Sequence, residues 1–157
     1  MRQQILTMLE MQNGMNQKVH SSWVDQNYEW YRAIWIECGE LMEHHGYKWW
    51  KKQSPDHEQV KLEIIDIWHF GMKALFSQYS TRGQIADYII KSWADTSNKL
   101  SIHEATEELA SCCLSYKTFS PKIFKKLMDS VDLDFDSLFI SYVGKNVLNF
   151  FRQDNGY

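Results

Sequence analysis

Two pairs of acidic residues have a spacing that could support chemistry: Glu37 with Glu40, and Glu63 with Asp66. The members of each pair are three residues apart and therefore share one face of a helix. A buried carboxylate without a partner costs several kcal/mol, so two opposed helices that each bury one predict a shared cation, and carboxylate oxygens favour magnesium. The apolar stripes that should bury Glu37 and Glu63 are Trp30, Ile34, Glu37 and Leu41, and Val60, Glu63, Ile67, Phe70 and Ala74.

The acidic pairs have a second interpretation, in which they form salt bridges on a non-enzymatic helical interaction domain. A single pair would favour this alternative, because acids are common on the exposed faces of helices. Two pairs on facing stripes favour the metal. Glu43 continues the series but is rotated by about 120° from Glu37 on a helix, so we expect it to be solvated.

Another polar group occurs near the end of the sequence, where Lys145, Asn149 and Arg152 are spaced at i, i+4 and i+7 on one helical stripe. Lysine supplies a point charge, arginine a planar fork and asparagine a paired donor and acceptor. This combination suits a phosphorylated ligand with a hydrogen-bonding head group, although an ordinary solvated face is the alternative. The opposite side of the helix is predicted to be apolar, with Val143, Val147, Phe150 and Phe151.

Further amides and aromatic residues are compatible with binding but less specific. Gln12 and Asn16 form an i, i+4 amide pair that could contact the edge of a base or lie on the surface. Trp49 and Trp50 could stack on a base. We expect at least one of these two tryptophans to close the core.

The histidines do not predict a zinc site. His44 and His45 point about 100° apart on a helix, and no cysteine or further histidine lies at ligand spacing. His69 is one position off the Glu63 stripe, so we expect it to pack or to support a ligand rather than to be one.

The elements that must position these residues are helices. With 7 Gly and 2 Pro in 157 residues, turn signals are too sparse for a many-stranded sandwich or barrel, and the length favours one domain over residues 1–157. Core helices are predicted within 3–79 and over 136–151; Gly46 ends the second, and Pro55 takes the first position of the third.

The segment 80–135 has a less distinctive pattern. Short helices are predicted over residues 85–94, 102–116 and 121–128, with a capping box formed by Ser101 and Glu104. The sequence in this region offers no candidate site residue.

Composition narrows the classes of function. The formal charge of −3 provides no general attraction to nucleic acid or to an acidic membrane, so a small ligand is favoured. Three cysteines, two of them adjacent, are too few for a disulfide framework and indicate a reducing compartment. No long apolar run and no secretory signal is visible, so we expect a soluble, cytoplasmic protein.

The sequence resembles the all-α NTP pyrophosphatases and, among them, the dimeric dUTPases. The matching blocks follow the family's order and cover about half of the chain. They are Met8-Leu-Glu-Met-Gln12 with Asn16, Trp30-Tyr-Arg with Glu37-x-x-Glu40-Leu, Tyr47-Lys-Trp-Trp-Lys51, Glu63-Ile-Ile-Asp66-Ile-Trp-His-Phe70, and a closing block from Tyr142 to Tyr157.

The resemblance implies a helical bundle of the all-α NTP pyrophosphatase type that hydrolyses dUTP, and dUDP, to dUMP. Such an enzyme keeps uracil out of DNA and supplies dUMP. The family's metal is Mg²⁺, more than one ion per site with Mn²⁺ able to substitute, and one ligating carboxylate acts as general base. The resemblance also implies a homodimer with a nucleotide substrate and without a nucleic acid or membrane partner.

The resemblance assigns roles to individual residues. The metal ligands, which are also the catalytic residues, would be Glu37, Glu40, Glu63 and Asp66. The substrate-binding residues would be Lys145 and Arg152 at the phosphates, Gln12, Asn16 and Asn149 around the base and sugar, and Trp50.

Two enzymatic alternatives remain open within the superfamily. Short phage-type members that hydrolyse both dCTP and dUTP end in a similar Arg-Gln-Asp-x-Gly-Tyr tail, and a broader MazG-like nucleoside triphosphate pyrophosphatase would share the acidic pairs. The segment 80–135 matches no block of the family.

Overall fold

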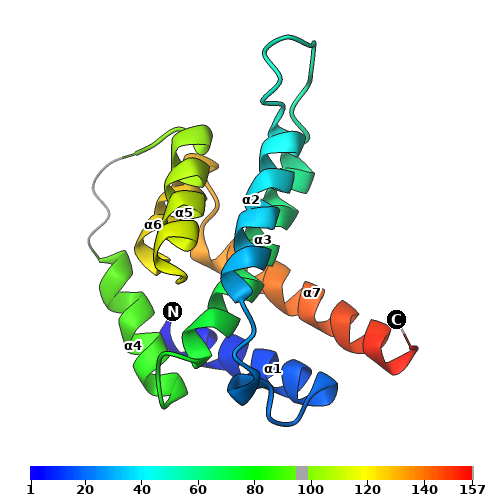
Figure 1. Cartoon of the computed structure of the whole chain (residues 1–157), viewed down its shortest axis with the longest axis vertical. Coiled ribbons are helices and arrows are strands. Elements are labelled where there is room, and N and C mark those ends of the chain that lie inside the picture. Colours follow the sequence, from blue (N-terminus) through cyan, green and yellow to red (C-terminus); the bar gives the residue numbers. More distant parts are fainter. Residues whose placement is uncertain (95–98, 157) are drawn as a thin grey trace.

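The computed structural model describes residues 1–94 and 99–156, and the regular structure of these residues is entirely helical. The predicted all-α fold is therefore confirmed, while Tyr157 of the closing block lies outside the described residues. Figure 1 shows the arrangement of the helices. They are α1 (Arg2–Val19), the short 3-10 helix η1 (Trp23–Gln26), α2 (Trp30–His45), α3 (His57–Phe76), α4 (Arg82–Trp93), α5 (Ile102–Tyr116), α6 (Pro121–Ser130) and α7 (Phe135–Asp154).

Helices α2 and α3 form an antiparallel pair at the centre of the molecule (Figure 1). At one end the Trp30 ring stacks on Phe70 with centroids 6.1 Å apart, and at the other the Asp56 amide donates to the His44 carbonyl at 2.9 Å. Gly46 ends α2 with φ +88, the left-handed conformation predicted for it. Facing positions on the two helices are thereby brought together.

Two details of this pair differ from the sequence-based expectation. Pro55 is not part of α3, because Asp56 caps the helix by accepting a hydrogen bond from the Gln59 amide at 3.1 Å. The helix also ends at Phe76 rather than near Tyr79. An Asx cap satisfies an amide of the first turn, which proline at the first helical position does not do.

Helices α1 and α7 lie side by side and run in the same direction. Gln4 donates to Asp136 at 2.9 Å near their beginnings, the Tyr142 hydroxyl donates to the Met8 carbonyl at 3.0 Å, and Lys18 pairs with Asp154 near their ends. This parallel packing places the middle of both helices against α3.

The predicted apolar side of α7 is only partly buried. Val147 and Phe151 are 58% and 64% exposed, whereas Val143 and Phe150 are half-buried. Part of this apolar side thus remains uncovered in the second half of the helix, which projects from the body of the molecule in Figure 1.

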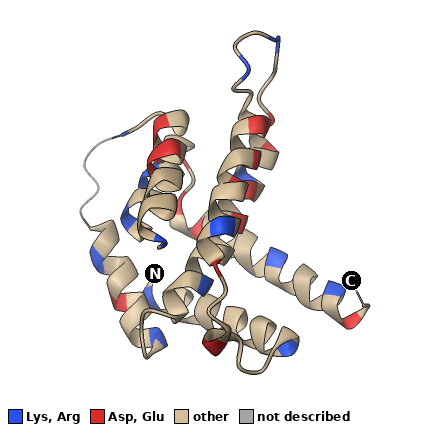
Figure 2. Ribbon diagram, viewed as in Figure 1, with Lys and Arg blue, Asp and Glu red and all other residues tan. Residues whose placement is uncertain are grey.

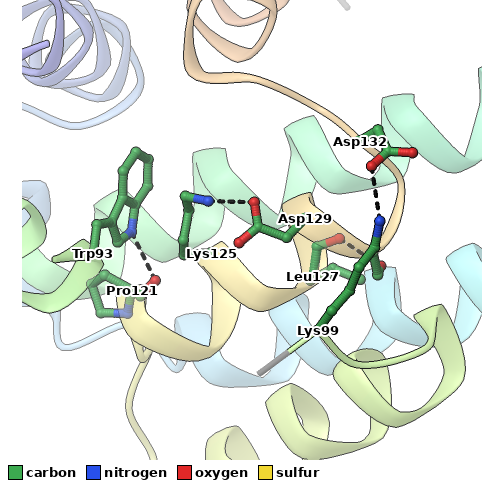
Figure 3. A network of polar contacts seen from close by, with 8 residues as sticks. Trp93, Lys99, Pro121, Lys125, Leu127, Asp129 and Asp132 are labelled. Atoms are coloured by element: carbon green, nitrogen blue, oxygen red, sulfur yellow. Dashed lines mark hydrogen bonds and ion pairs between the residues drawn. The ribbon is translucent and has the colours of Figure 1, made fainter. Parts of the chain in front are cut away.

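Helices α4, α5 and α6 close the other side of the core. The capping box at Ser101 and Glu104 and the predicted span of α5 are confirmed. The indole of Trp93 donates to the Pro121 carbonyl at 2.8 Å, a contact visible in Figure 3 that joins α4 to α6. Gly71 on α3 allows close packing, because a Cβ there would lie 2.6 Å from the Phe119 ring.

The connector between α2 and α3, residues 46–56, projects from the ends of these two helices (Figure 1). Trp49 and Trp50 lie in it and are 89% and 60% exposed, with their rings packed against each other at 5.3 Å. The expectation that one of them closes the core is wrong. Lys48 precedes the tryptophan doublet and Lys51 and Lys52 follow it. The polar groups of the connector favour contact with solvent.

Candidate active site

Three of the four acidic residues predicted to hold a metal converge in the structure, and Glu40 is not among them. Glu37, Glu63 and Asp66 each offer a carboxylate oxygen, and these atoms all lie within 4.8 Å of one another. Figure 2 shows acidic residues gathered along the neighbouring faces of the two helices. We call these three residues the acidic cluster.

Glu37 is less buried than its predicted stripe implies. The buried residues of α2 are Tyr31, Ile34, Cys38 and Leu41, so Cys38 and not Glu37 occupies the centre of the stripe. Glu37 and Trp30 are half-buried at its edge, whereas Glu63 is buried with 7% exposure. An edge position lets Glu37 reach both the protein interior and a ligand from solvent.

The acidic cluster is electrostatically unfavourable without a cation. The pKa of Glu37 is raised to about 8. Burial is the largest cause, and the charge of Asp66, the hydrogen bond with Glu63 and the charge of Glu40 act in the same direction. The pKa of Glu63 is also raised, mainly by burial. At neutral pH Glu37 therefore favours a proton, or a metal ion in its place.

Glu40 belongs to the site through its charge rather than through a short contact. It is exposed on α2, one turn from Glu37, and its charge raises the pKa of both Glu37 and Glu63. Its exposure leaves the carboxylate accessible to a ligand at the mouth of the acidic cluster.

Three basic groups approach the acidic cluster. Lys145 on α7 forms an ion pair with Asp66, and His44 Nε2 lies 3.4 Å from Glu63 Oε1. Lys73, which the sequence did not single out, lies over the rings of Trp30 and Phe70 at 4.9 and 4.6 Å. Burial lowers the pKa of the Lys73 ammonium to about 8, and the charge of Asp66 opposes this shift.

A neutral polar network adjoins the acidic cluster. It consists of Gln12 and Asn16 from α1, His69 from α3, and Tyr142 and Asn146 from α7, all of them buried. Gln12 donates to Asn16 Oδ1 at 3.0 Å, and its own Oε1 accepts from the Tyr142 hydroxyl at 3.0 Å and lies 2.9 Å from His69 Nδ1. Gln12 is thus the centre of the neutral network.

The chain connects the two groups directly. His69 follows Asp66 by one turn of α3, and Asn146 follows Lys145 on α7. The His69 ring stacks on Tyr142 with centroids 4.1 Å apart, and burial lowers the pKa of His69 to about 3, with smaller effects from Lys73 and Lys145. His69 is therefore neutral, as a residue that packs and supports its neighbours should be.

The neutral network has unused hydrogen-bonding capacity. Within residues 1–94 and 99–156, the buried side-chain atoms without a hydrogen-bond partner are Asn16 Nδ2, His69 Nε2 and Asn146 Oδ1. Because an unpaired buried polar group costs about 1–3 kcal/mol, three of them in one network indicate a place for a polar ligand or for water.

Sequence reasoning missed Tyr142 and Asn146 as members of this network. The prediction for this helix rested on the stripe of Lys145, Asn149 and Arg152, and did not include the neighbouring face, which carries Tyr142 and Asn146. The signal that could have found them is the i, i+4 spacing of Tyr142 and Asn146, which repeats that of Gln12 and Asn16.

The other predicted substrate residues lie farther out on their elements. Asn149 is half-buried on α7, and Arg152 is exposed in its last turn. Trp50 lies in the projecting connector, where its ring also packs against Tyr47 at 6.0 Å. The structure thus brings together the acidic cluster, Lys145, Gln12 and Asn16, whereas Trp50 lies in the connector that projects from the ends of α2 and α3.

The donor set fits a hard divalent cation. It consists of carboxylate oxygens, which Mg²⁺ and Mn²⁺ accept, and it lacks a thiolate among the converging atoms of the described residues. The raised pKa of Glu37 and Glu63 has the sign expected of ligands that repel each other until a cation separates them.

Comparison with known families assigns the chain to one of them. A sequence model of a family of dUTPases matches residues 4–157, nearly the whole chain. The chain belongs to the dimeric, all-α dUTPase family. Hydrolysis of dUTP, the activity of a dUTP diphosphatase, is the activity of this family and follows for its member.

The family match also covers the segment 80–135, for which the sequence blocks gave no correspondence. No curated protein compared with the chain is a significant match. Among the described helices, none is both long and apolar enough to cross a membrane.

Proposed function

We propose that this dUTPase family member hydrolyses dUTP, and dUDP, to dUMP in a reaction that depends on Mg²⁺ bound at the acidic cluster, with Mn²⁺ able to substitute. The observation that supports the metal is the convergence of Glu37, Glu63 and Asp66 within 4.8 Å beside Lys145. Glu40, at the mouth of the cluster, completes the ligand set. More than one ion per site is compatible with four carboxylates.

A divalent cation at these carboxylates would neutralise phosphate oxygens and lower the pKa of bound water. The residues of the chain divide the remaining tasks. Lys145, which neutralises Asp66 in the structure, becomes available to a phosphate oxygen once Asp66 binds metal. One carboxylate of the acidic cluster accepts the proton of the attacking water, since a general base must lie within hydrogen-bonding reach of it.

The neutral network is the proposed binding region for the base. Gln12 and Asn16 lie there, and the unpaired atoms of Asn16, His69 and Asn146 can hydrogen-bond with a polar ring. Asn149 would contact the sugar, and Arg152 and Trp50 would have to approach from exposed positions when substrate binds. Binding of the base at this end places the phosphates toward Lys145 and the acidic cluster.

The metal site is tested by Glu63→Gln and Asp66→Asn, with Glu43→Gln as the matched control on the exposed side of α2. Release of pyrophosphate from dUTP is measured as a function of Mg²⁺ concentration. We expect the two site variants to lose at least about 1,000-fold in kcat/KM and the control to retain the activity. Full magnesium-dependent turnover by either site variant would overturn the assignment.

The nucleotide specificity is tested with a panel of dUTP, dUDP, dCTP, dTTP, dATP and dGTP and identification of the products. Preference for dUTP and dUDP supports the proposal. Equal turnover of dCTP and dUTP favours the phage-type alternative, and turnover of all triphosphates favours a MazG-like pyrophosphatase. Absence of hydrolysis and of a magnesium-dependent rise in Tm with a non-hydrolysable dUTP analogue would favour the non-enzymatic interaction domain.

We also propose that the protein is a homodimer in which the second half of α7 contacts a second copy of the chain. Exposed apolar residues gather there, and a dimer would remove this surface from water; the residues are Val147, Leu148 and Phe151, and Ile140 in the first half of the helix is exposed as well. The family's dimeric character supports the same partner. Sedimentation of Val147→Glu, with Tyr116→Glu on α5 as control, tests the interface: a variant at position 147 that remains a dimer would contradict it.

The setting proposed for this activity is the cytoplasm, without a nucleic acid or membrane partner. The three cysteines of the chain are free, as expected in a reducing compartment. Burial raises the pKa of Cys38 and Cys113, which keeps these two thiols protonated. The cellular role would be to keep uracil out of DNA and to supply dUMP. Fractionation of cells that express a tagged chain tests the location.

A further inference from the structure

A second group of metal-binding side chains lies where α2 ends and α3 and α5 begin. His45 is the last residue of α2, His57 the first of α3 and His103 the second of α5. The sequence argued against a zinc site because no second histidine lies at ligand spacing from His45. That argument considered spacing along one helix, whereas the fold brings together His45 and His103, which are 58 residues apart.

The two imidazoles have nearly the separation that two ligands of one ion require. His45 Nδ1 lies 3.0 Å from His103 Nε2, and the ring planes are inclined by 88°. Zn–N bonds of about 2.0–2.1 Å at a tetrahedral centre place two nitrogens about 3.3 Å apart. The separation of the nitrogens is therefore close to that of two ligands, and binding of an ion requires the two rings to turn until both lone pairs converge on it.

The protonation state of His45 favours coordination. Burial lowers the pKa of this imidazole, and the nearby charges of His103 and His57 lower it further. A neutral imidazole is the form that binds metal. His57 lines the same pocket as His45. Among the described residues only the acidic cluster brings three ligand atoms within 4.8 Å of one another, so the His57 ring would have to turn toward the pair to share an ion.

A pocket of about 360 Å³ opens beside this pair, and its wall supplies further donors. His45, His57 and Asp132 all line it, together with Lys61. Figure 3 shows Asp132 in an ion pair with Lys99, with a distance of 3.1 Å between Nζ and Oδ1. The side chain of Asp132 is 86% exposed in this pair.

We propose that His45 and His103, with His57 and Asp132 as further ligands, bind one Zn²⁺ or a similar borderline divalent ion at this pocket. Imidazole nitrogens select such ions, whereas the carboxylates of the acidic cluster favour Mg²⁺. The consecutive residues His44 and His45 serve different sites, because His44 faces Glu63. The inference does not depend on the proposed dUTPase mechanism.

The position of the ligands gives the ion a structural consequence. His45 and His57 immediately flank the connector 46–56, and His103 belongs to α5. An ion held by all three would fix both ends of the connector to α5. Binding requires no net release of a proton, because the imidazole that donates in the pair can move its proton to its other ring nitrogen.

The test is calorimetric titration of Zn²⁺ into the full chain in the presence of excess Mg²⁺, which occupies the acidic cluster. We expect one Zn²⁺ per chain and a rise in Tm on binding. His103→Gln should weaken binding by more than the 10–100-fold that loss of an outer-shell partner costs. His20→Gln, an identical change at an exposed histidine in another part of the molecule, should leave Zn²⁺ binding unchanged.

Two further measurements guard against an unfolded variant. The ring nitrogen signals of His45 and His103 in the unaltered chain should shift with Zn²⁺ but not with Mg²⁺. His57→Gln, at an exposed position, should fold normally and bind Zn²⁺ about tenfold more weakly. Failure of the unaltered chain to bind Zn²⁺ saturably, binding by His103→Gln equal to that of the unaltered chain, or unchanged ring signals would overturn the proposal.

Discussion

The acidic cluster and the neutral network are neighbours that the fold stabilises in opposite ways. In the acidic cluster, like charges approach one another and only part of the repulsion is balanced, by Lys145 and His44. In the neutral network, Gln12 connects three other side chains by hydrogen bonds and no member is charged. The acidic cluster, the charged half of the site, therefore needs a cation. The neutral network, the other half, needs only matching hydrogen-bond donors and acceptors.

The two halves also depend on pH in opposite directions. Glu37 retains a proton in the folded state up to a pKa of about 8 instead of 4.5, so its contribution to stability is lost as the pH rises between these values. His69 remains neutral down to a pKa of about 3 instead of 6.5, so its contribution is lost as the pH falls from 6.5 toward 3. A nucleotide with a charged end and a neutral end matches this division.

After the carboxylates of the acidic cluster, the largest effect on activity is expected at Lys145, which links the acidic cluster to the neutral network. Replacing it in Lys145→Met removes the ammonium beside Asp66 and should lower kcat/KM for dUTP about 100-fold, or about 2.7 kcal/mol. Steady-state kinetics at saturating Mg²⁺ measure the change, with Lys91→Met on the exposed face of α4 as control. Activity within about threefold of the unaltered chain would show that Lys145 serves only the ion pair with Asp66.

The centre of the neutral network should matter most for stability. Gln12→Leu has a similar volume but leaves Asn16, His69 and Tyr142 without their common partner, and we expect a loss of about 2 kcal/mol in the free energy of unfolding. Urea denaturation in metal-free buffer measures it. Gln3→Leu, at an exposed position of the same helix, is the control. A loss below about 0.5 kcal/mol would indicate that water replaces the hydrogen bonds that Gln12 makes in the network.

Removal of a charge from the acidic cluster should stabilise the metal-free protein, whereas the change at Gln12 should destabilise it. Glu37→Gln replaces a carboxyl group with a neutral isostere, so the metal-free variant should have a higher Tm than the unaltered chain at pH 8 and a similar Tm at pH 5, where Glu37 is protonated. The same variant should gain less Tm from Mg²⁺. A lower Tm at pH 8 would mean that the Glu37 carboxylate is stabilised rather than repelled by its surroundings.

The sequence predicted the charged half better than the neutral half for a physical reason. Glu63 and Asp66 stand out because acids on an apolar stripe conflict with burial, and periodicity alone places them opposite Glu37. Tyr142 and Asn146 create no such conflict, because a tyrosine and an amide suit either a surface or a core. Only the parallel packing of α1 and α7, which brings Met8 and Gln12 to Tyr142, gives them partners.

The same limit explains the errors in the fold. Helix periodicity predicted α5 to the residue, but it could not show that Val147 and Phe151 remain exposed or that Trp49 and Trp50 lie in a projecting connector. Burial of an apolar residue depends on which element or which second chain covers it. A pattern within one helix carries no information about that neighbour.

The smallest effect is expected at Lys73, which tests whether the positive charge inside the charged half is needed. Its ammonium lies over Trp30 and Phe70, and burial has lowered its pKa from 10.5 to about 8. Lys73→Met keeps the contacts of the stem with these rings and removes the buried charge. Loss of the cation–π contacts and relief of desolvation oppose each other, so we expect a net change within about 1 kcal/mol at pH 7.

The pH dependence of the free energy of unfolding distinguishes this outcome from one in which Lys73 neutralises the charge of Asp66. A lysine with a depressed pKa makes the unaltered chain gain stability as the pH rises from 8 to 10.5, and Lys73→Met should lack that gain. Urea denaturation at pH 7 and pH 10 measures both quantities, with Lys61→Met on the exposed face of α3 as control. If Lys73→Met instead loses 3 kcal/mol or more at pH 7, as breaking a buried ion pair does, Lys73 balances the charge of Asp66, and the acidic cluster is less dependent on a metal than the comparison with the neutral network indicates.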